Sequence, residues 1–283
     1  MESFDIYEYR GEKLREKLES IFSTGKIHSV LYSNPNNPTW VCLTDEELKI
    51  IGELANKYDV IILEDLAYFG MDFRKDYSHP GVAPFQPTVG KYTDNYILML
   101  STSKAFSYAG ERCAVLGISN KLAERRYPDL KEFCGQEIFA RGIIFGALHP
   151  LSSGTSHSAQ YAVAGVMKAV NDGTYNYRDD VLEYGHKAKM MKDAFTSNGF
   201  KFTYDEDLGE PIADGFYFTY YYPGFTGAEL LEKMLYYGIS AISLDTCGST
   251  RQGIRACTSL IQRDEIPVLA ERLKRFAEDH PIK

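Results

Sequence analysis

The sequence predicts an α/β protein, in which a large domain with a mostly parallel sheet precedes a smaller α+β domain. In the first half of the chain, short apolar runs alternate with amphipathic segments, which is typical of βα units around a parallel sheet. A long helical pattern begins at Arg178, and short strands and helices are interleaved after it. These observations predict one domain over residues 1–177 and a second, which includes the long helix, over residues 178–283.

Local signals predict the elements of the first domain. Thr44 is followed three residues later by Glu47, a capping-box pattern that begins a helix. Val60–Leu63 is a continuous apolar run and predicts a strand that is buried on both faces. Apolar residues at helical spacing continue the helix after Thr44, namely Leu48, Ile51, Leu54, Ala55 and Tyr58. The other expected segments are a helix at Glu12–Phe22 and strands at Ser29–Ser33, Tyr96–Leu100 and Ala114–Ser119.

The second domain is expected to open with one long helix. Its apolar residues recur at spacings of three and four, namely Val181, Tyr184, Ala188, Met191 and Phe195. Four strands are expected after Gly199, at Phe200–Tyr204, Gly215–Tyr222, Ser240–Leu244 and Gly253–Cys257. Helices are expected at Gly227–Tyr237 and in a last segment that ends near Glu278. This interleaving is typical of a small α+β domain.

Composition argues against several classes of function. The net charge is −8 and no run of Lys or Arg forms a basic stripe, so we expect no nucleic-acid partner, although a single phosphate needs only a few local donors. The first residues do not resemble a secretory signal and the apolar stretches are too short to span a bilayer, so no membrane partner is expected. The five cysteines are scattered and the histidines lack ligand spacing. We interpret the cysteines as reduced, buried thiols of a cytoplasmic protein and expect no metal site.

Two motifs directly follow expected strands of the first domain. The segment Asn34–Thr39 is interpreted either as a turn, which Asn and Pro favour, or as a loop that aims the Asn37 amide at a ligand. Asp65 follows the apolar strand Val60–Leu63 and either caps a helix or faces a cation. The second interpretation arises because a buried, unpaired carboxylate is costly.

The strongest motif follows the expected strand Tyr96–Leu100. It places hydroxyls at Ser101 and Ser103, an amine at Lys104 and a guanidinium at Arg112. The alternative is an ordinary surface lysine in a loop. Two hydroxyls and an arginine near one lysine favour a phosphate site, and cationic neighbours also lower the lysine pKa, as an imine-forming amine requires.

A late arginine, Arg255, lies inside the apolar strand Gly253–Cys257. An arginine on a strand is usually solvated. One that is flanked by Ile254 and Ala256 is also able to point into a cleft and bind a carboxylate bidentately. Both interpretations stay open on these residues alone.

In order, spacing and residue type, these motifs together resemble the class I/II aminotransferases, which are fold type I enzymes dependent on pyridoxal 5'-phosphate (PLP). The resemblance covers essentially the whole chain, and its most specific part is the Ser-x-Ser-Lys-x5-Gly-x-Arg segment around Lys104. It implies that Lys104 binds the cofactor covalently and then acts as the general base. It also implies that Asp65 pairs with the pyridine nitrogen, and that Tyr68 and Asn37 hydrogen-bond the ring oxygen.

The same resemblance assigns the phosphate of the cofactor to Ser101, Ser103 and Arg112, and the substrate α-carboxylate to Arg255. It implies a large domain with a seven-stranded, mostly parallel sheet, a smaller C-terminal domain, and an active site at a homodimer interface. The implied substrates are an amino acid and a 2-keto acid. Which amino acid is used is not determined by the sequence.

The chain departs from the family pattern in two ways. Trp40 stands where family members usually carry glycine, so a left-handed backbone there would be strained and the loop reshaped. The resemblance also begins well into the family's chain. We therefore expect a fragment with an incomplete large-domain sheet, which lacks the glycine-rich phosphate loop, exposes an edge and apolar surface, and is inactive by itself.

Two other functions remain as alternatives. A PLP-dependent C–S lyase would use the same cofactor for β-elimination. A non-catalytic module, either the ligand-sensing half of a regulator or an inert scaffold, would keep the fold without the reaction. The segment Ser152–Ser156 resembles a loop that often reaches the partner subunit's site.

Overall fold

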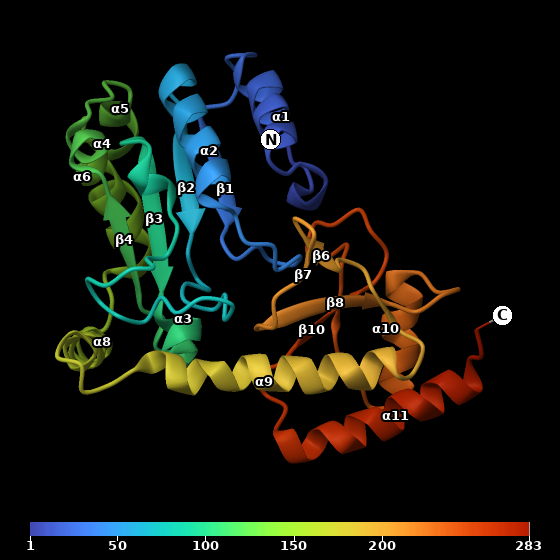
Figure 1. Cartoon of the computed structure of the whole chain (residues 1–283). Helices are drawn as coiled ribbons and strands as arrows, with labels where there is room; N and C mark the ends of the chain where they lie inside the picture. Colours follow the sequence, from blue (N-terminus) through green and yellow to red (C-terminus); the bar gives the residue numbers. More distant parts are fainter. Residues whose placement is uncertain (283) are drawn as a thin grey trace.

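The computed structural model describes residues 1–282 and arranges them around two main sheets (Figure 1). The first sheet has the strand order β1–β2–β3–β4; β1, β2 and β3 are parallel, and β4 is antiparallel to β3. Its strands are β1 (Ser29–Ser33), β2 (Ile61–Asp65), β3 (Tyr96–Ser101) and β4 (Ala114–Ile118). The prediction of an α/β fold with a mostly parallel sheet is confirmed.

Helices α1 (Glu12–Phe22) and α2 (Asp45–Tyr58) cover one face of this sheet. Helix α2 begins with the predicted capping box. The Thr44 hydroxyl accepts from the Glu47 N–H at 3.2 Å, and the Glu47 carboxylate accepts from the Thr44 N–H at 3.0 Å. Apolar residues of both helices pack with Val60 and Ile62 in one core cluster. Side-chain caps and one apolar stripe therefore determine this layer.

The prediction that the second strand is buried on both faces is wrong. Ile62 and Glu64 are buried, whereas Ile61, Leu63 and Asp65 are half-buried. Successive strand residues point to opposite faces, so the α1–α2 layer buries only one set of them. The other face is covered incompletely by the described residues.

The chain between β4 and the long helix α9 (Tyr177–Thr196) is mostly helical, although the sequence analysis expected no defined elements there. The helices are α4 (Asn120–Glu124), α5 (Leu130–Cys134), α6 (Phe139–Ile143), a π-helix (Ile144–Leu148), α7 (His149–Ser152) and α8 (His157–Asn171). Single turns elsewhere are η1 (Ile6–Glu8), η2 (Val89–Lys91), α3 (Thr102–Ala105) and η3 (Ala109–Glu111). Between β4 and α9, several large apolar side chains are exposed, among them Phe133, Leu151 and Tyr161.

The second sheet has the order β5–β8–β10–β9, and all its pairings are antiparallel. Its strands are β5 (Lys201–Phe202), β8 (Tyr217–Tyr221), β9 (Ile242–Ser243) and β10 (Ile254–Cys257). A separate hairpin joins β6 (Glu206–Asp207) to β7 (Glu210–Pro211). Helices α10 (Gly227–Tyr236) and α11 (Ile266–Asp279) complete this α+β part, with a single turn η5 (Arg263–Glu265) before α11.

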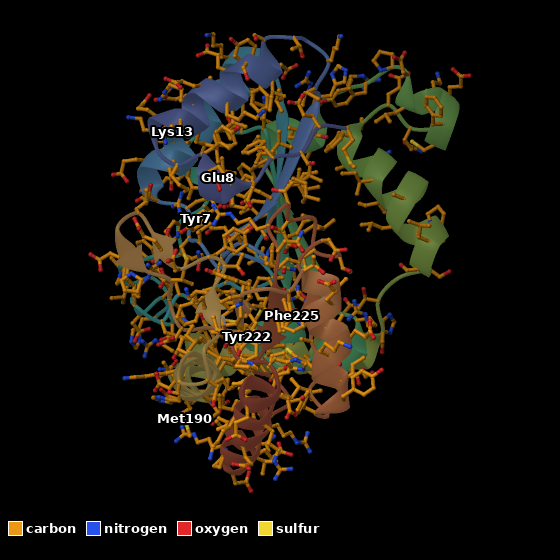
Figure 2. All side chains as sticks on the ribbon, turned by 90° about the vertical axis from the view of Figure 1, so that its right-hand side faces the viewer. Tyr7, Glu8, Lys13, Met190, Tyr222 and Phe225 are labelled. Atoms are coloured by element: carbon orange, nitrogen blue, oxygen red, sulfur yellow. The ribbon has the colours of Figure 1, made fainter. Side chains whose placement is uncertain are left out.

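Helix α9 connects the two parts of the molecule. In Figure 1 it runs from beside α3, below the first sheet, to the second sheet and α11, and it contacts α3, β8 and α11. Its buried residues join an aromatic core in which the rings of Phe195 and Tyr220 stack at 3.9 Å. Tyr222 and Phe225 extend this core in the lower half of Figure 2.

The N-terminal segment contacts the second part directly. The Tyr7 hydroxyl donates to the Asp205 carboxylate at 2.9 Å, and the Arg251 guanidinium lies 4.6 Å from the centre of the Tyr7 ring. Arg251 also pairs with Glu8. Figure 2 places Tyr7 and Glu8 above the residues of the second part, so the segment before α1 belongs to the surface where the two parts meet.

The cysteines are all free thiols, but the prediction that they are buried holds only for Cys113. Cys257 is exposed at the end of β10, and the other three are half-buried. Cysteine is on average a buried residue type, and that average does not determine single positions at strand ends and loops. Among residues 1–282, no helix combines the length and the apolar character that crossing a bilayer requires.

Candidate active site

Several of the predicted site residues lie at one edge of the first sheet. In the parallel register, Ser33 of β1 stands beside Asp65 of β2, which stands beside Met99 of β3. Ser101 ends β3 two residues later. The carboxyl ends of parallel strands meet at the same edge, so the loops after β1, β2 and β3 converge there.

Asp65 and Tyr68 come from the turn after β2. The Asp65 carboxylate accepts from the Ala67 N–H at 2.9 Å, so it caps this turn and keeps its second oxygen for other partners. Tyr68 is buried and its hydroxyl lies 3.3 Å from that of Tyr217. Burial is the largest cause that raises the pKa of Tyr68 well above its ordinary value, and the hydrogen bond with Tyr217 is the next largest. The charge on Arg255 lowers this pKa, whereas the charge on Asp65 raises it. These four side chains therefore share one electrostatic environment.

Lys104 lies in the single turn α3, directly after β3. The Ser101 hydroxyl accepts from the Ser103 N–H at 3.2 Å and caps this turn. The Lys104 side chain is half-buried, with Nζ 4.7 Å from the centre of the Phe216 ring. Within residues 1–282, the Lys104 amine has no carboxylate or hydrogen-bond partner.

Arg112 is more exposed than the phosphate assignment would suggest. It has a left-handed backbone, with φ of 50°, and its Nη1 donates to the Ala109 carbonyl at 2.8 Å. No carboxylate of the described residues lies within ion-pair distance of it. The structure brings Ser101 and Ser103 into contact, but it shows no hydrogen bond from Arg112 to either of them.

Asn37 and Arg255 meet although they are 218 residues apart in the sequence. Arg255 Nη1 donates to Asn37 Oδ1 at 2.6 Å, and its guanidinium stacks 3.9 Å from the centre of the Tyr217 ring. Arg255 Nε is buried and has no partner among the described residues. The side chain thus points from β10 across to the loop after β1, with one of its donors free.

Trp40 forms part of the wall of the site. It is fully buried and has φ of 63°, so the loop keeps a left-handed residue here although the side chain is large. Its ring lies 5.2 Å from Tyr68 and 6.0 Å from Tyr217, and it packs against Gly215. Packing against these two rings and Gly215 holds Trp40 in a conformation that costs an isolated residue about 1–2 kcal/mol.

Three aromatic residues of the site were not predicted from the sequence: Trp40, Phe216 and Tyr217. Phe216 and Tyr217 belong to the aromatic run before and within β8, which was predicted only as a strand. The signal that was present is the density of aromatic residues beside Gly215, because such a run next to a glycine marks a place where another large ring can approach closely.

Comparison with known proteins identifies relatives of the chain. Residues 4–273 match the family described as aminotransferase class I and II. A probable aspartate aminotransferase of Methanocaldococcus jannaschii is 28% identical over 122 residues, which are 43% of this chain and 30% of that protein. A cystathionine beta-lyase of Corynebacterium glutamicum is 27% identical over 141 residues, 50% of this chain and 35% of that protein.

The fold is likewise that of solved aminotransferases. The crystal structure of an aromatic aminotransferase from Pyrococcus horikoshii superimposes with a TM-score of 0.69 at 16% identity and covers 98% of this chain but 64% of its own. The chain therefore spans less than two thirds of the length of these relatives. Since the family match extends over nearly all residues and the fold agrees, the chain belongs to the aminotransferase class I and II family.

Proposed function

We propose that this protein is a PLP-dependent aminotransferase that moves an amino group between an amino acid and a 2-keto acid. The observation that carries the proposal is the half-buried amine of Lys104, which lies on the Phe216 ring and has no carboxylate partner in residues 1–282. An amine that pairs with no acid is free to react with an aldehyde. Family membership supports the same reaction class.

The free polar groups of the site fit the proposed cofactor. Ser101 and Ser103 offer hydroxyls beside Lys104, and Asp65 keeps one carboxylate oxygen free for a protonated ring nitrogen. Tyr68 keeps its hydroxyl proton, because its pKa is raised. The chemistry that PLP supplies when bound is the withdrawal of electrons from the substrate Cα.

The residues of the chain would then divide the work as follows. Lys104 holds the cofactor, and once released its ε-amine takes the proton from the substrate Cα and returns it during transfer. Arg255 binds the α-carboxylate, which fixes the Cα–H bond relative to that amine. Asn37 orients the Arg255 guanidinium through the hydrogen bond at 2.6 Å. Arg112 is proposed as a phosphate ligand that turns toward the site when the phosphate is bound.

A C–S lyase is the second candidate, and the similarity to a cystathionine beta-lyase favours it. Both reactions begin with loss of the Cα proton, so Lys104 and Arg255 would serve either one. The products separate them: an elimination releases pyruvate and ammonia without a keto-acid acceptor, whereas a transamination requires the acceptor and follows ping-pong kinetics.

Borohydride reduction of the protein with PLP, followed by peptide mapping, tests the proposal. We expect a single labelled peptide that contains Lys104, and loss of the label in Lys104→Ala. Lys91→Ala is the matched control, because that lysine is exposed and forms an ion pair with Asp45 at 3.1 Å. Label on another lysine, or none at all, would contradict the assignment.

Three further expectations remain proposals. We propose two domains, residues 1–177 and 178–283, a homodimer whose partner subunit contributes to the site, and a cytoplasmic location. Sedimentation of the protein with and without PLP tests the dimer, and limited proteolysis near residue 177 tests the domain boundary.

A further inference from the structure

We propose that Asp207 is a positioning residue for the carboxylate-binding pair of the active site. A buried ion cluster of Asp207 with Arg10 and Arg74 fixes the loop between β1 and α2, and this loop holds the Asn37 amide against Arg255. The inference rests on the proposed function, because the role of Arg255 as the carboxylate ligand is assigned there.

Asp207 enters the first part of the molecule from the β6–β7 hairpin. Its side chain is 4% exposed, and each of its two oxygens meets a different arginine. Oδ1 accepts from Arg10 Nη1 at 2.6 Å, and Oδ2 accepts from Arg74 Nη2 at 2.9 Å. A buried carboxylate is tolerated only when such charge-assisted hydrogen bonds replace its hydration, so this position is defined by the two arginines.

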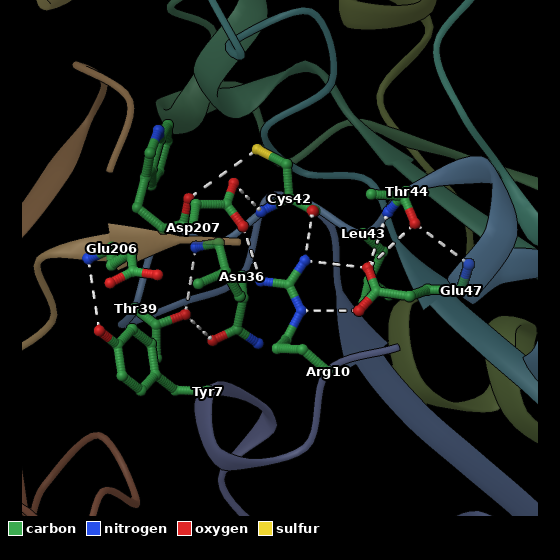
Figure 3. Close-up of polar contacts among 12 residues, drawn as sticks. Tyr7, Arg10, Asn36, Thr39, Cys42, Leu43, Thr44, Glu47, Glu206 and Asp207 are labelled. Atoms are coloured by element: carbon green, nitrogen blue, oxygen red, sulfur yellow. Dashed lines mark hydrogen bonds and ion pairs between the residues drawn. The ribbon is translucent and has the colours of Figure 1, made fainter. Parts of the chain in front are cut away.

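Arg10 links Asp207 to the start of helix α2. Its Nε and Nη2 donate to the Glu47 carboxylate at 2.8 and 2.9 Å, and Glu47 caps α2 through Thr44 (Figure 3). Burial alone would raise the pKa of Glu47, but the hydrogen bond from Arg10, followed by those from the backbone of Thr44 and Gly11, holds the pKa below its ordinary value. Glu47 therefore stays charged and the cluster stays paired.

The cluster also holds the peptide groups of Cys42. Its carbonyl accepts from Arg10 Nη2 at 3.0 Å, and its N–H donates to Asp207 Oδ2 at 3.3 Å (Figure 3). Arg10 and Asp207 therefore bind the carbonyl and the N–H of the same residue, Cys42. Cys42 lies at the end of the loop that begins after β1.

Hydrogen bonds within the loop join Val41, the neighbour of Cys42, to Asn36, the neighbour of Asn37. The Asn36 N–H donates to the Val41 carbonyl at 2.9 Å, and the Trp40 N–H donates to the Asn36 carbonyl at 2.8 Å. The Thr39 hydroxyl donates to Asn36 Oδ1 at 2.9 Å. These bonds tie residues 36–41 together, so we expect a displacement of Cys42 to displace Asn37 as well.

A purely stabilising role is the competing explanation, because breaking a buried ion cluster also lowers stability. The two explanations differ in what happens to the loop while the protein is folded. Trp40 is the single tryptophan of the chain and lies inside this loop, so its emission reports the loop position without any cofactor. Acrylamide quenching measures how far the Trp40 ring is accessible.

The test compares Asp207→Asn with Glu206→Gln in the full chain, well below the unfolding midpoint of each variant. Glu206 is the exposed neighbour on the same hairpin, and its substitution removes the same charge without touching the cluster. Arg74→Gln is the second variant, because Arg74 is exposed and its loss leaves the Arg10 contact with Asp207 intact, although Asp72 also loses its partner at 2.8 Å. This variant keeps the test decisive if Asp207→Asn does not fold.

We expect stronger acrylamide quenching of Trp40 in Asp207→Asn, a smaller rise in Arg74→Gln and none in Glu206→Gln. Calorimetric titration of the PLP-equilibrated protein with 2-oxoglutarate should show binding about tenfold weaker in Asp207→Asn, the loss typical of one misplaced charge-assisted hydrogen bond.

Quenching and binding in Asp207→Asn that equal those of Glu206→Gln, with only a lower unfolding midpoint, would overturn the proposal. If the unsubstituted protein binds no 2-oxoglutarate, the assigned role of Arg255 fails. The quenching of Trp40 still decides in that case whether Asp207 fixes the loop.

Discussion

Replacing Gly215 with alanine should destabilise the protein, and replacing Trp40 with glycine should remove that effect. A methyl group at Gly215 would lie 2.2 Å from Cε2 and 2.3 Å from Nε1 of Trp40. The indole ring is fully buried and borders Tyr68 and Tyr217, so it has no free direction in which to retreat. The two positions are therefore coupled through one contact.

The magnitudes follow from burial and backbone conformation. Overpacking of this kind costs about 1–3 kcal/mol of unfolding free energy or more, and the rigid ring places Gly215→Ala at the upper end. Trp40→Gly loses about 3–5 kcal/mol through the cavity and regains about 1–2 kcal/mol, because φ of 63° is relaxed for glycine. In the double variant the new methyl group faces the cavity, so Gly215→Ala should cost nothing or stabilise slightly.

Urea unfolding followed by circular dichroism measures all four states of this cycle. Gly165→Ala is the control, because a methyl group there meets no atom within 4 Å in helix α8 and should stabilise by up to about 1 kcal/mol. Additive effects of Gly215→Ala and Trp40→Gly would refute the contact. So would a Gly215→Ala variant as stable as the Gly165→Ala variant.

Other expectations concern buried carboxylates. Burial, opposed by hydrogen bonds from Thr88 and Val89, raises the pKa of Glu64 above 4.5, so the folded state keeps a proton that the unfolded chain has already lost. Stability should fall as pH rises from 4.5 through the raised pKa, and urea unfolding of Glu64→Gln should lack this decline. Glu47 has a lowered pKa, so its stabilisation is present above 4.5 and lost as pH falls through the lowered value. Glu47→Gln should cost about 1–3 kcal/mol at pH 7, measured in the same way, and this cost should shrink as pH falls through the lowered value.

Much of the fold was predictable because its signals are local. The capping box at Thr44 and Glu47, the apolar stripe of α2 and the strand runs each lie within a few residues of sequence. Three of the four proposed site motifs follow strands whose ends are marked by composition, and the fourth, Arg255, lies inside a strand. Parallel strands then bring their ends together by geometry alone.

What the sequence did not predict depends on contacts between distant residues. Asp207 was one acid among many, and only the fold brings it to Arg10, 197 residues away. The hairpin that carries it has strands of two residues, too short for any periodic pattern. Trp40 was expected to be strained, and its left-handed backbone is tolerated because Tyr68, Tyr217 and Gly215 shape a place for the ring.

The hydrogen bonds of the Arg255 guanidinium relate these distant contacts to the proposed binding of a substrate carboxylate. Asn37 occupies Nη1 and the Tyr217 ring covers one face, while Nε is buried without an acceptor among the described residues. A buried donor without a partner costs about 1–3 kcal/mol. A substrate carboxylate that accepts from Nε would recover this cost on binding, but only while Asn37 keeps the guanidinium turned in the required direction. Under the proposed role of Arg255, affinity for the carboxylate would therefore depend on how firmly the loop after β1 is held, and through that loop on the ion cluster around Asp207.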